Sequence, residues 1–150
     1  MATIRITKMY DFEMAHVLKD YDGPCRNIHG HSYKLYVTVI GSPLEDPGSP
    51  KKGMVMDFKD LKAIVKRNIV DRFDHALVIN SETDREMVES MKKHMEKLII
   101  VDYQPTSENL VMDFAGIIQS HLPDHVQLHN LRLWETATSY SEWFAEDQSQ

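Results

Sequence analysis

The stretch HGHSYKLYVTVIG, residues 29–41, alternates apolar and polar side chains from Tyr33 onward. Successive side chains of a β-strand point to opposite faces, so this alternation predicts a strand with one buried face. The predicted buried positions are Tyr33, Leu35, Val37 and Val39, and the positions between them are Lys34, Tyr36 and Thr38. The predicted strand covers residues 32–41, and two histidines around a glycine directly precede it, so side chains that can bind metal ions lie next to its start.

Two other segments show the same period of two. Residues 3–12, TIRITKMYDF, begin with Ile4 and Ile6 on one face. Residues 130–137, NLRLWETA, place four side chains on a common face: Leu131, Leu133, Glu135 and Ala137. We expect both segments to be strands, the first forming a hairpin with residues 32–41.

Three segments have helical periodicity. Residues 57–73 start at Asp57, a good N-cap, and space one apolar stripe along the segment: Phe58, Leu61, Ile64, Val65, Ile69 and Phe73. Residues 106–122 start at Thr106 and repeat the form with Leu110, Phe114, Ile117 and Ile118. Residues 81–98 have Ser81 and Asp84 near a capped start and carry Met87, Met91 and Met95 at four-residue spacing, a stripe typical of core or interface packing.

The predicted order is strand, strand, helix, helix, strand, helix, strand. Adjacent strands without crossovers favour an antiparallel sheet with helices packed on one face, the α+β class. We expect a single domain over residues 1–150, with a Pro-, Gly- and Ser-rich loop at residues 41–53 and a flexible tail at about residues 145–150.

The composition narrows the class of protein. A formal net charge of −6 argues against a nucleic-acid or membrane-surface protein, and no apolar run is long enough to cross a bilayer. One cysteine, with no secretory signal pattern at the N-terminus, is typical of the reducing cytoplasm, which is the location we expect.

Three histidines can meet if the first two strands form a hairpin. His29 and His31 are two residues apart and point the same way in an extended segment, while His16 follows the first strand. Three imidazoles with an open fourth position describe a catalytic zinc site. Chance is the alternative, because the chain has eight histidines, and a lone His16 is ordinarily a surface or satisfied core residue.

Cys25, Asp74, His75 and Glu135 each have two interpretations. Cys25 is either a small buried apolar residue or, beside a metal, a thiolate base. Asp74 and His75 are either loop polarity or a proton relay. Glu135, on the apolar face of its strand, either forms a structural salt bridge or accepts two hydrogen bonds from adjacent N–H groups of a ligand.

The ordered set of these motifs resembles the 6-pyruvoyl-tetrahydropterin synthase superfamily, most closely its 6-carboxy-tetrahydropterin synthase branch in queuosine biosynthesis. The resemblance runs nearly end to end, through FEMAH, CRNIHGHSYKLYVTV, GMVMDFKDLK, DHALVIN, PTSENL and LRLWET. Three residues separate Cys25 from His29, which resembles the carboxy branch; the pyruvoyl-forming branch usually has five. The loop at residues 41–53 and the segment 81–98 look longer than in compact bacterial members.

The resemblance implies a role for each candidate residue. It implies His16, His29 and His31 as zinc ligands, Cys25 as the catalytic cysteine and Asp74 with His75 as the relay. It also implies Glu135 as the pterin anchor, with Thr106, Ser107 and Glu108 approaching the pterin ring.

The implied function is that of a zinc-dependent lyase. It would convert 7,8-dihydroneopterin triphosphate to 6-carboxy-5,6,7,8-tetrahydropterin with release of triphosphate and acetaldehyde. The alternatives are the pyruvoyl-forming reaction, which keeps the side chain, and a non-catalytic zinc- or pterin-binding subunit. The implied fold is the tunnelling fold (T-fold), whose sheets assemble around a barrel as a trimer or a dimer of trimers, with active sites between subunits.

Overall fold

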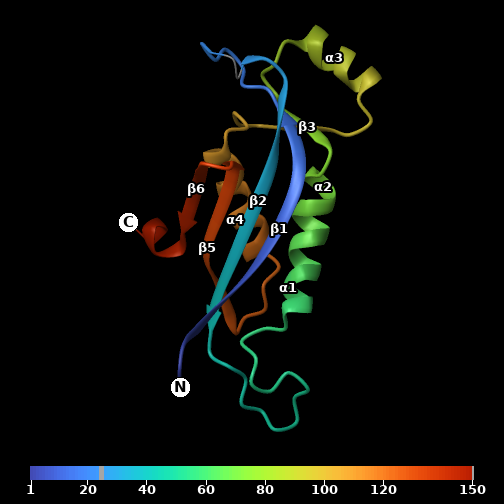
Figure 1. Ribbon diagram of the computed structural model, residues 1–150. Coiled ribbons are helices and arrows are strands. Elements are labelled where there is room, and N and C mark those ends of the chain that lie inside the picture. The colour runs from blue at the N-terminus through green and yellow to red at the C-terminus, as the bar shows by residue number, and fades with distance from the viewer. Residues whose placement is uncertain (24–25, 150) are drawn as a thin grey trace.

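One six-stranded sheet organises the molecule (Figure 1). The computed structural model describes residues 1–23 and 26–149. The strands are β1 Ile4–His16, β2 His29–Gly41, β3 Ala76–Asn80, β4 Leu98–Val101, β5 Val126–Thr136 and β6 Ser139–Phe144. Their order across the sheet is β4-β3-β1-β2-β5-β6, so the long hairpin of β1 and β2 lies at its centre.

The central hairpin is the one that the alternation predicts. Strands β1 and β2 pair antiparallel, with Ile4 opposite Gly41 at one end and His16 opposite His29 at the other. Strands β5 and β6 continue the antiparallel pairing. Strand β3 pairs parallel to β1 and β4 parallel to β3, so the sheet is mixed, not wholly antiparallel as expected. Parallel neighbours need crossover connections, and helical segments precede both β3 and β4.

The helices begin where the sequence predicts. Helix α1 (Phe58–Val65) is capped by Asp57, whose side chain accepts from the backbone N–H of Lys59. It continues through a π-helical turn, η2 (Lys66–Val70), into α2 (Asp71–Phe73). Helix α4 (Ser107–Gln119) is capped by Thr106. Helix α3 (Arg85–His94) is capped by Asp84 and is shorter than expected, because Leu98 already belongs to β4.

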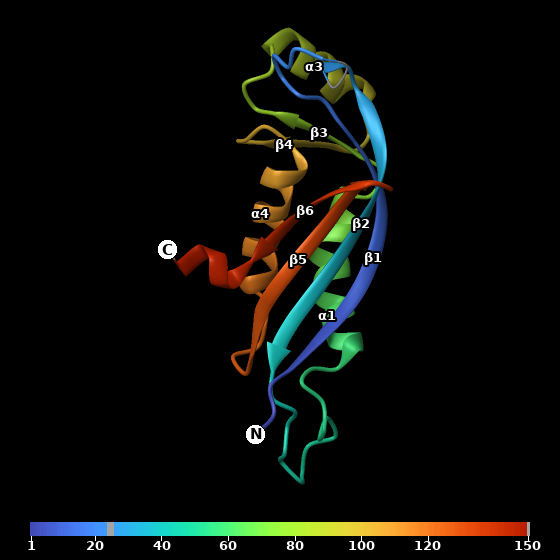
Figure 2. The same cartoon turned by 60° about the vertical axis from the view of Figure 1, so that its left-hand side comes forward.

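The main core lies between the sheet and the helices α1 and α4 (Figure 2). It contains the predicted strand face of β2 and most of the two helical stripes: Tyr33, Leu35, Val37, Val39, Leu61, Val65, Ile69, Phe73, Leu110, Phe114 and Ile118. Phe58 is 51% exposed and does not join this core, since it occupies the first helical position. The α+β class with helices packed on the sheet is confirmed.

A second, smaller core involves α3. Leu77 and Ile79 of β3 pack with Val88 and Met91 of α3, whereas the intervening Val78 belongs to the main core. Helix α3 therefore contacts the β3 side chains that point away from the main core. Of the predicted methionine stripe, Met91 is buried, while the other two methionines, Met87 and Met95, are exposed.

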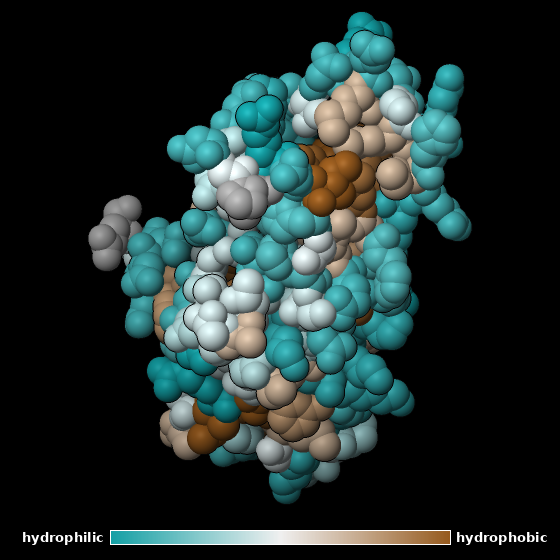
Figure 3. Space-filling model, turned by 45° about the horizontal axis from the view of Figure 1, so that its top comes forward, coloured by the Kyte–Doolittle hydropathy of each residue, from teal (hydrophilic) through white to brown (hydrophobic). Residues whose placement is uncertain are grey.

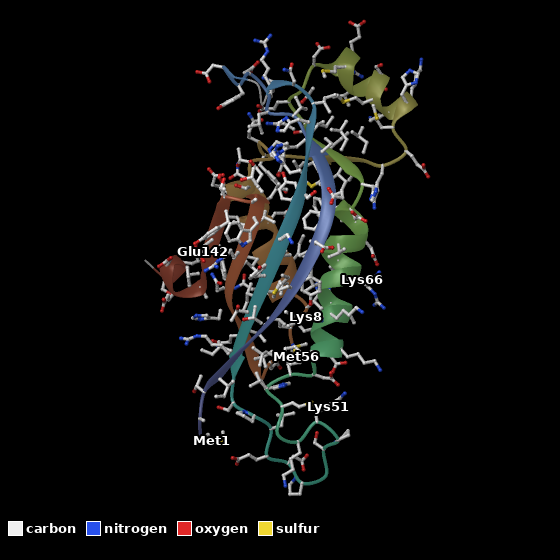
Figure 4. The ribbon with its side chains drawn as sticks, in the orientation of Figure 1. Met1, Lys8, Lys51, Met56, Lys66 and Glu142 are labelled. Carbon is white, nitrogen blue, oxygen red and sulfur yellow. The ribbon has the colours of Figure 1, made fainter. Side chains whose placement is uncertain are left out.

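The connection from β2 to α1 lies at the end of the hairpin that carries Gly41. Figure 4 shows Lys51 and Met56 there, near Met1 and far from the other end of β1. His16 and His29 lie at that other end. Near the C-terminus the chain forms a 3₁₀-helix, η3 (Ala145–Ser149). Within the described residues, the helices are all too short or too polar to cross a bilayer.

Candidate metal centre and its surroundings

The histidine triad, His16, His29 and His31, gathers at one end of the hairpin. His16 ends β1 directly opposite His29, the first residue of β2, and His31 lies two residues further on the same face. The ring centroids are 4.5 Å apart for His16 and His29, 4.9 Å for His29 and His31, and 5.2 Å for His16 and His31. One nitrogen from each ring lies within 4.8 Å of the others.

Backbone carbonyls fix two of these rings. His16 Nδ1 is 2.7 Å from the carbonyl oxygen of Pro105, and His29 Nδ1 is 2.7 Å from that of Asn27. A carbonyl only accepts, so both Nδ1 atoms carry the proton when the imidazoles are neutral. Both Nε2 atoms then present lone pairs, and these two atoms are 2.9 Å apart. Facing lone pairs at this distance are stabilised by a shared cation.

The third ring, that of His31, has a nitrogen without a hydrogen-bond partner. His31 Nε2 is buried and has no hydrogen-bond partner among the described residues. Zinc binds imidazole nitrogen at about 2.0–2.1 Å, which sets tetrahedral ligand nitrogens roughly 3.3 Å apart. The Nε2 atoms of His16 and His29 are 2.9 Å apart, and the ligand nitrogens of all three rings lie within 4.8 Å of one another. Hydrogen bonds from the second ring nitrogen to a carbonyl are the usual support of metal-binding histidines. The residues present therefore fit a three-histidine metal centre.

Burial favours the neutral form of His16 and His31, which is the form that binds a metal. Burial lowers the pKa of His16 to about 4, against the hydrogen bond to Pro105, and the neighbouring His29 and His31 lower it further. Burial also lowers the pKa of His31, although Glu135 opposes the shift. Protons therefore compete weakly with a metal for these nitrogens near neutral pH.

Glu135 of β5 lies beside the triad. Its Oε1 is 3.7 Å from Nε2 of His31, and the two side chains are 27% and 18% exposed. No hydrogen bond to this carboxylate is found among the described residues, so its oxygens can accept from a bound molecule. A single bound molecule could therefore contact both the Glu135 carboxylate and a metal ion held by the triad.

The PTSEN segment reaches the same place from α4. The carbonyl of Pro105 holds His16, and the next residue, Thr106, caps α4 by accepting from the N–H of Asn109. The hydroxyl of Ser107 donates to Glu108 Oε1 at 2.9 Å and lies 2.7 Å from the hydroxyl of Ser141 on β6. Thr106 and Ser107 are therefore tied into the protein, whereas Glu108 is exposed.

The Asp74–His75 pair lies on the other side of the sheet from the triad. His75 lines a hollow of about 730 Å³ with Ala15 and Leu77. Ala15 lies between Met14 and His16 in β1, so its side chain points away from the main core, which contains Met14. Figure 3 shows apolar side chains in the otherwise hydrophilic surface at this end of the molecule, where Ile28 and Met95 line the same hollow.

The pair itself is an ordered unit. His75 Nδ1 is 3.1 Å from Asp74 Oδ1, and the backbone N–H of Glu13 donates to that oxygen at 2.8 Å. The Glu13 hydrogen bond is the main reason that the pKa of Asp74 is lowered. The His75 side chain is 77% exposed, on a backbone with φ of 64°, which residues other than glycine rarely adopt. The ring is therefore held through Nδ1 by Asp74, while the rest of it is exposed to solvent.

Some sequence predictions meet at the triad and others do not. The structure brings together His16, His29, His31 and Glu135, with the start of α4 next to them. It does not bring Asp74 and His75 to the same face. Cys25 lies outside the described residues.

Sequence reasoning missed three contributors around the triad. Two are the carbonyls of Pro105 and Asn27, which carry no side-chain signal. The third is Gln104, whose amide exchanges hydrogen bonds with the backbone of Lys19 and so fixes the segment before Thr106. A polar amide directly before a proline was the available signal.

Comparisons with known proteins agree with this geometry. Residues 5–146 match the family model described as 6-pyruvoyl tetrahydropterin synthase. The chain is 41% identical to the 6-carboxy-5,6,7,8-tetrahydropterin synthase of Haemophilus influenzae over 143 residues, which cover 93% of this chain and 97% of the relative. It is 33% identical to the protein of the same name from Synechocystis sp., covering 93% and 92% of the two chains.

Solved structures give the same result for the fold. The 6-pyruvoyl tetrahydropterin synthase of Caenorhabditis elegans superposes with a TM-score of 0.66 at 25% identity, covering 97% of each chain. That of Plasmodium vivax gives a TM-score of 0.73 at 15% identity, covering 95% of this chain and 98% of the other. The T-fold is therefore shown. The chain belongs to the 6-pyruvoyl tetrahydropterin synthase family of enzymes.

Proposed function

We propose that the protein is a zinc-dependent lyase that converts 7,8-dihydroneopterin triphosphate to 6-carboxy-5,6,7,8-tetrahydropterin, releasing triphosphate and acetaldehyde. The observation that carries the proposal is the histidine triad with Glu135 3.7 Å from His31, in a chain whose relatives are named for this product. As the resemblance implies, the reaction would belong to queuosine biosynthesis.

The triad would hold the zinc ion through His16, His29 and His31. When bound, zinc supplies Lewis-acid chemistry, which acidifies hydroxyl groups of the substrate side chain. Hydrogen bonds from His16 to Pro105 and from His29 to Asn27 fix these ligands before substrate arrives. Fixed ligands lose little entropy on binding, so orientation is a large part of their contribution.

Glu135 would accept two hydrogen bonds from the pterin edge, with Thr106, Ser107 and Glu108 beside the ring. Anchoring the ring places its side chain over the triad. Ser107, linked to Ser141 and Glu108, is already fixed for such a contact. Binding energy at the ring is then used to orient carbons that react several ångströms away.

Cys25 would be the base on the substrate side chain, as a thiolate whose pKa a neighbouring cation lowers. His75, oriented by Asp74, would carry out the complementary proton transfer. In the net reaction, the ring gains two hydrogens, the side chain loses its triphosphate, and water is consumed as the carboxyl group and acetaldehyde form.

Assembly of several subunits would bring the histidine triad of one chain together with the Asp74–His75 pair of another. In its own chain, the exposed ring of His75 lies on the opposite face of the sheet from the triad. A homo-oligomer, a trimer or a dimer of trimers, would place His75 of one subunit beside the triad of another. The substrate would then be bound between subunits.

Mass spectrometry of the products tests the proposal. Zinc-loaded protein is incubated with 7,8-dihydroneopterin triphosphate, with a Cys25→Ala variant and a chelator-treated sample as controls. We expect 6-carboxytetrahydropterin and acetaldehyde from the untreated protein alone. A product that retains the three-carbon side chain would assign the pyruvoyl-forming reaction instead. An unchanged substrate would leave only a non-catalytic binding role.

A further inference from the structure

Lys97, at the start of the chain's return from α3 to the sheet, makes an unusual pair of hydrogen bonds. Its ammonium group donates to the backbone carbonyls of Asp71 and Asp74, at 2.6 Å each. The last carbonyls of a helix have no partner within the helix, and a cation is favoured at this end. Lys97 therefore provides hydrogen-bond donors for the carbonyls at the end of α2. This end leads into Asp74 and His75, the proposed proton relay.

Lys97 is itself fixed by the sheet. Its carbonyl accepts from the backbone N–H of Leu77 at 3.0 Å, in the register that pairs β3 with β4. The side chain also lines the hollow that contains Asp74 and His75. The lysine thus connects a rigid strand to the Asp74 turn, unlike a flexible surface lysine.

The Asp74–His75 turn is held from two sides. On one side, Glu13 of β1 donates its N–H to the Asp74 carboxylate and accepts from the N–H of His75 at 2.5 Å. On the other side, Lys97 holds the carbonyl of Asp74. The positive charge of Lys97 is the last of several causes, after the Glu13 hydrogen bond, that lower the pKa of Asp74.

This second support matters because His75 has an unfavourable backbone. With φ of 64°, the residue departs from the conformations that histidine prefers, so the turn persists only where its surroundings determine it. The exposed ring contributes little packing of its own. Without Lys97, the carbonyl of Asp74 loses this hydrogen bond, and the turn can change its backbone conformation.

We propose that Lys97 is a positioning residue that acts through Asp74 to aim the ring of His75. This inference depends on the proposed function, in which His75 transfers a proton. Lys97 itself touches no reacting atom. Its role is to keep Asp74 and His75 in the one arrangement that a substrate bound to a neighbouring subunit can use.

Kinetics of the Lys97→Met variant test this role. We expect kcat to fall about 10-fold or more, the range typical of residues that orient a functional group, with KM nearly unchanged and zinc retained. Lys97→Arg, which keeps the donors, should recover most of the activity. Lys93→Met, at an exposed lysine of α3, is the matched control and should leave kcat unchanged. A fall in the control as large as that in Lys97→Met overturns the proposal.

A double-mutant cycle separates positioning from a merely structural role. If Lys97 acts through His75, Lys97→Met should cost nothing further in a His75→Gln background, because coupled residues are not additive. An equal loss in both backgrounds would show that the lysine acts elsewhere. The same pair of variants also controls for loss of stability, which lowers activity in either background.

A spectroscopic measurement keeps the inference testable if the proposed reaction is wrong. The ring C–H signal of His75, assigned with His75→Gln, is compared by NMR in the full-length protein and in Lys97→Met. We expect this signal to shift or broaden while that of His121, an exposed histidine after α4, stays in place. A moved His75 signal without pterin turnover refutes the function alone. An unmoved signal refutes the positioning role.

Discussion

The histidine triad and the Asp74–His75 pair are built in opposite ways. The triad lies on the main-core side of β1 and β2, with His16 buried, His29 and His31 half-buried, and two of the rings fixed by backbone carbonyls. The pair lies on the other side, where the ring of His75 is 77% exposed and only its base is held. One half is complete within a chain, and the other points away from it. In the proposed function, the triad and the Asp74–His75 pair would therefore work together only across subunits.

The largest effect is expected from removing a triad ligand. His29→Ala should abolish zinc binding and lower turnover by more than about 100-fold, because losing a ligand costs more than losing its orienting partner. Metal analysis of the purified protein together with a turnover assay measures both effects. His121→Ala, at an exposed histidine beyond the end of α4 that is distant from the triad, is the control and should keep both properties. Full zinc content in His29→Ala would contradict the assignment of the triad.

A smaller effect is expected from replacing His75, the exposed residue of the Asp74–His75 pair. His75→Gln should reduce kcat by about 100-fold, the lower end of the range for general acid–base catalysis, and leave zinc content at the level of the unmodified protein. The reason is that no hydrogen bond or ion pair joins His75 to the triad among the described residues of the chain. Parallel metal analysis and kinetics measure the separation. Loss of zinc in this variant would show that the two halves are not independent in the chain.

The smallest effect concerns the stability of the metal-free protein. In the folded state the pKa of His16 is lowered to about 4, so the unfolded chain binds more protons between that value and about pH 6.5. The free energy of unfolding should therefore rise as the pH is raised through this window, and fall as it is lowered, by up to about 1.4 kcal/mol per pH unit from this group. Denaturant titrations measure the slope. His16→Gln should flatten it and His121→Gln should not; equal slopes in both would count against a buried, neutral His16.

The sequence predicts the central hairpin well because its physical signal is local. The alternation in residues 32–41 requires one buried face, and the register then brings His16 opposite His29. Strand β3 is harder to predict, since ALVIN is a short, continuous apolar run without a period, buried on both faces. Strand β6, SYSEWF, is mostly polar or exposed and offers little signal.

The side of the sheet on which some of the candidate site residues lie depends on strands that are harder to predict. The triad follows from spacing and the hairpin, so it could be predicted. The side on which His75 lies depends on the parallel pairing of β3 with β1, where Met14 is opposite Ala76. The partners of His16 and Lys97 are backbone carbonyls, whose positions follow from the fold as a whole.

Complementation between two inactive variants tests the central claim most directly. His29→Ala and His75→Gln chains, carrying different tags, are co-expressed and the mixed assemblies are purified. If each site takes its triad from one subunit and His75 from another, about a quarter of the sites should be intact in mixed hexamers and about a third in mixed trimers, with turnover to match. Mixed assemblies as inactive as either variant alone would contradict the claim that the two halves meet across subunits.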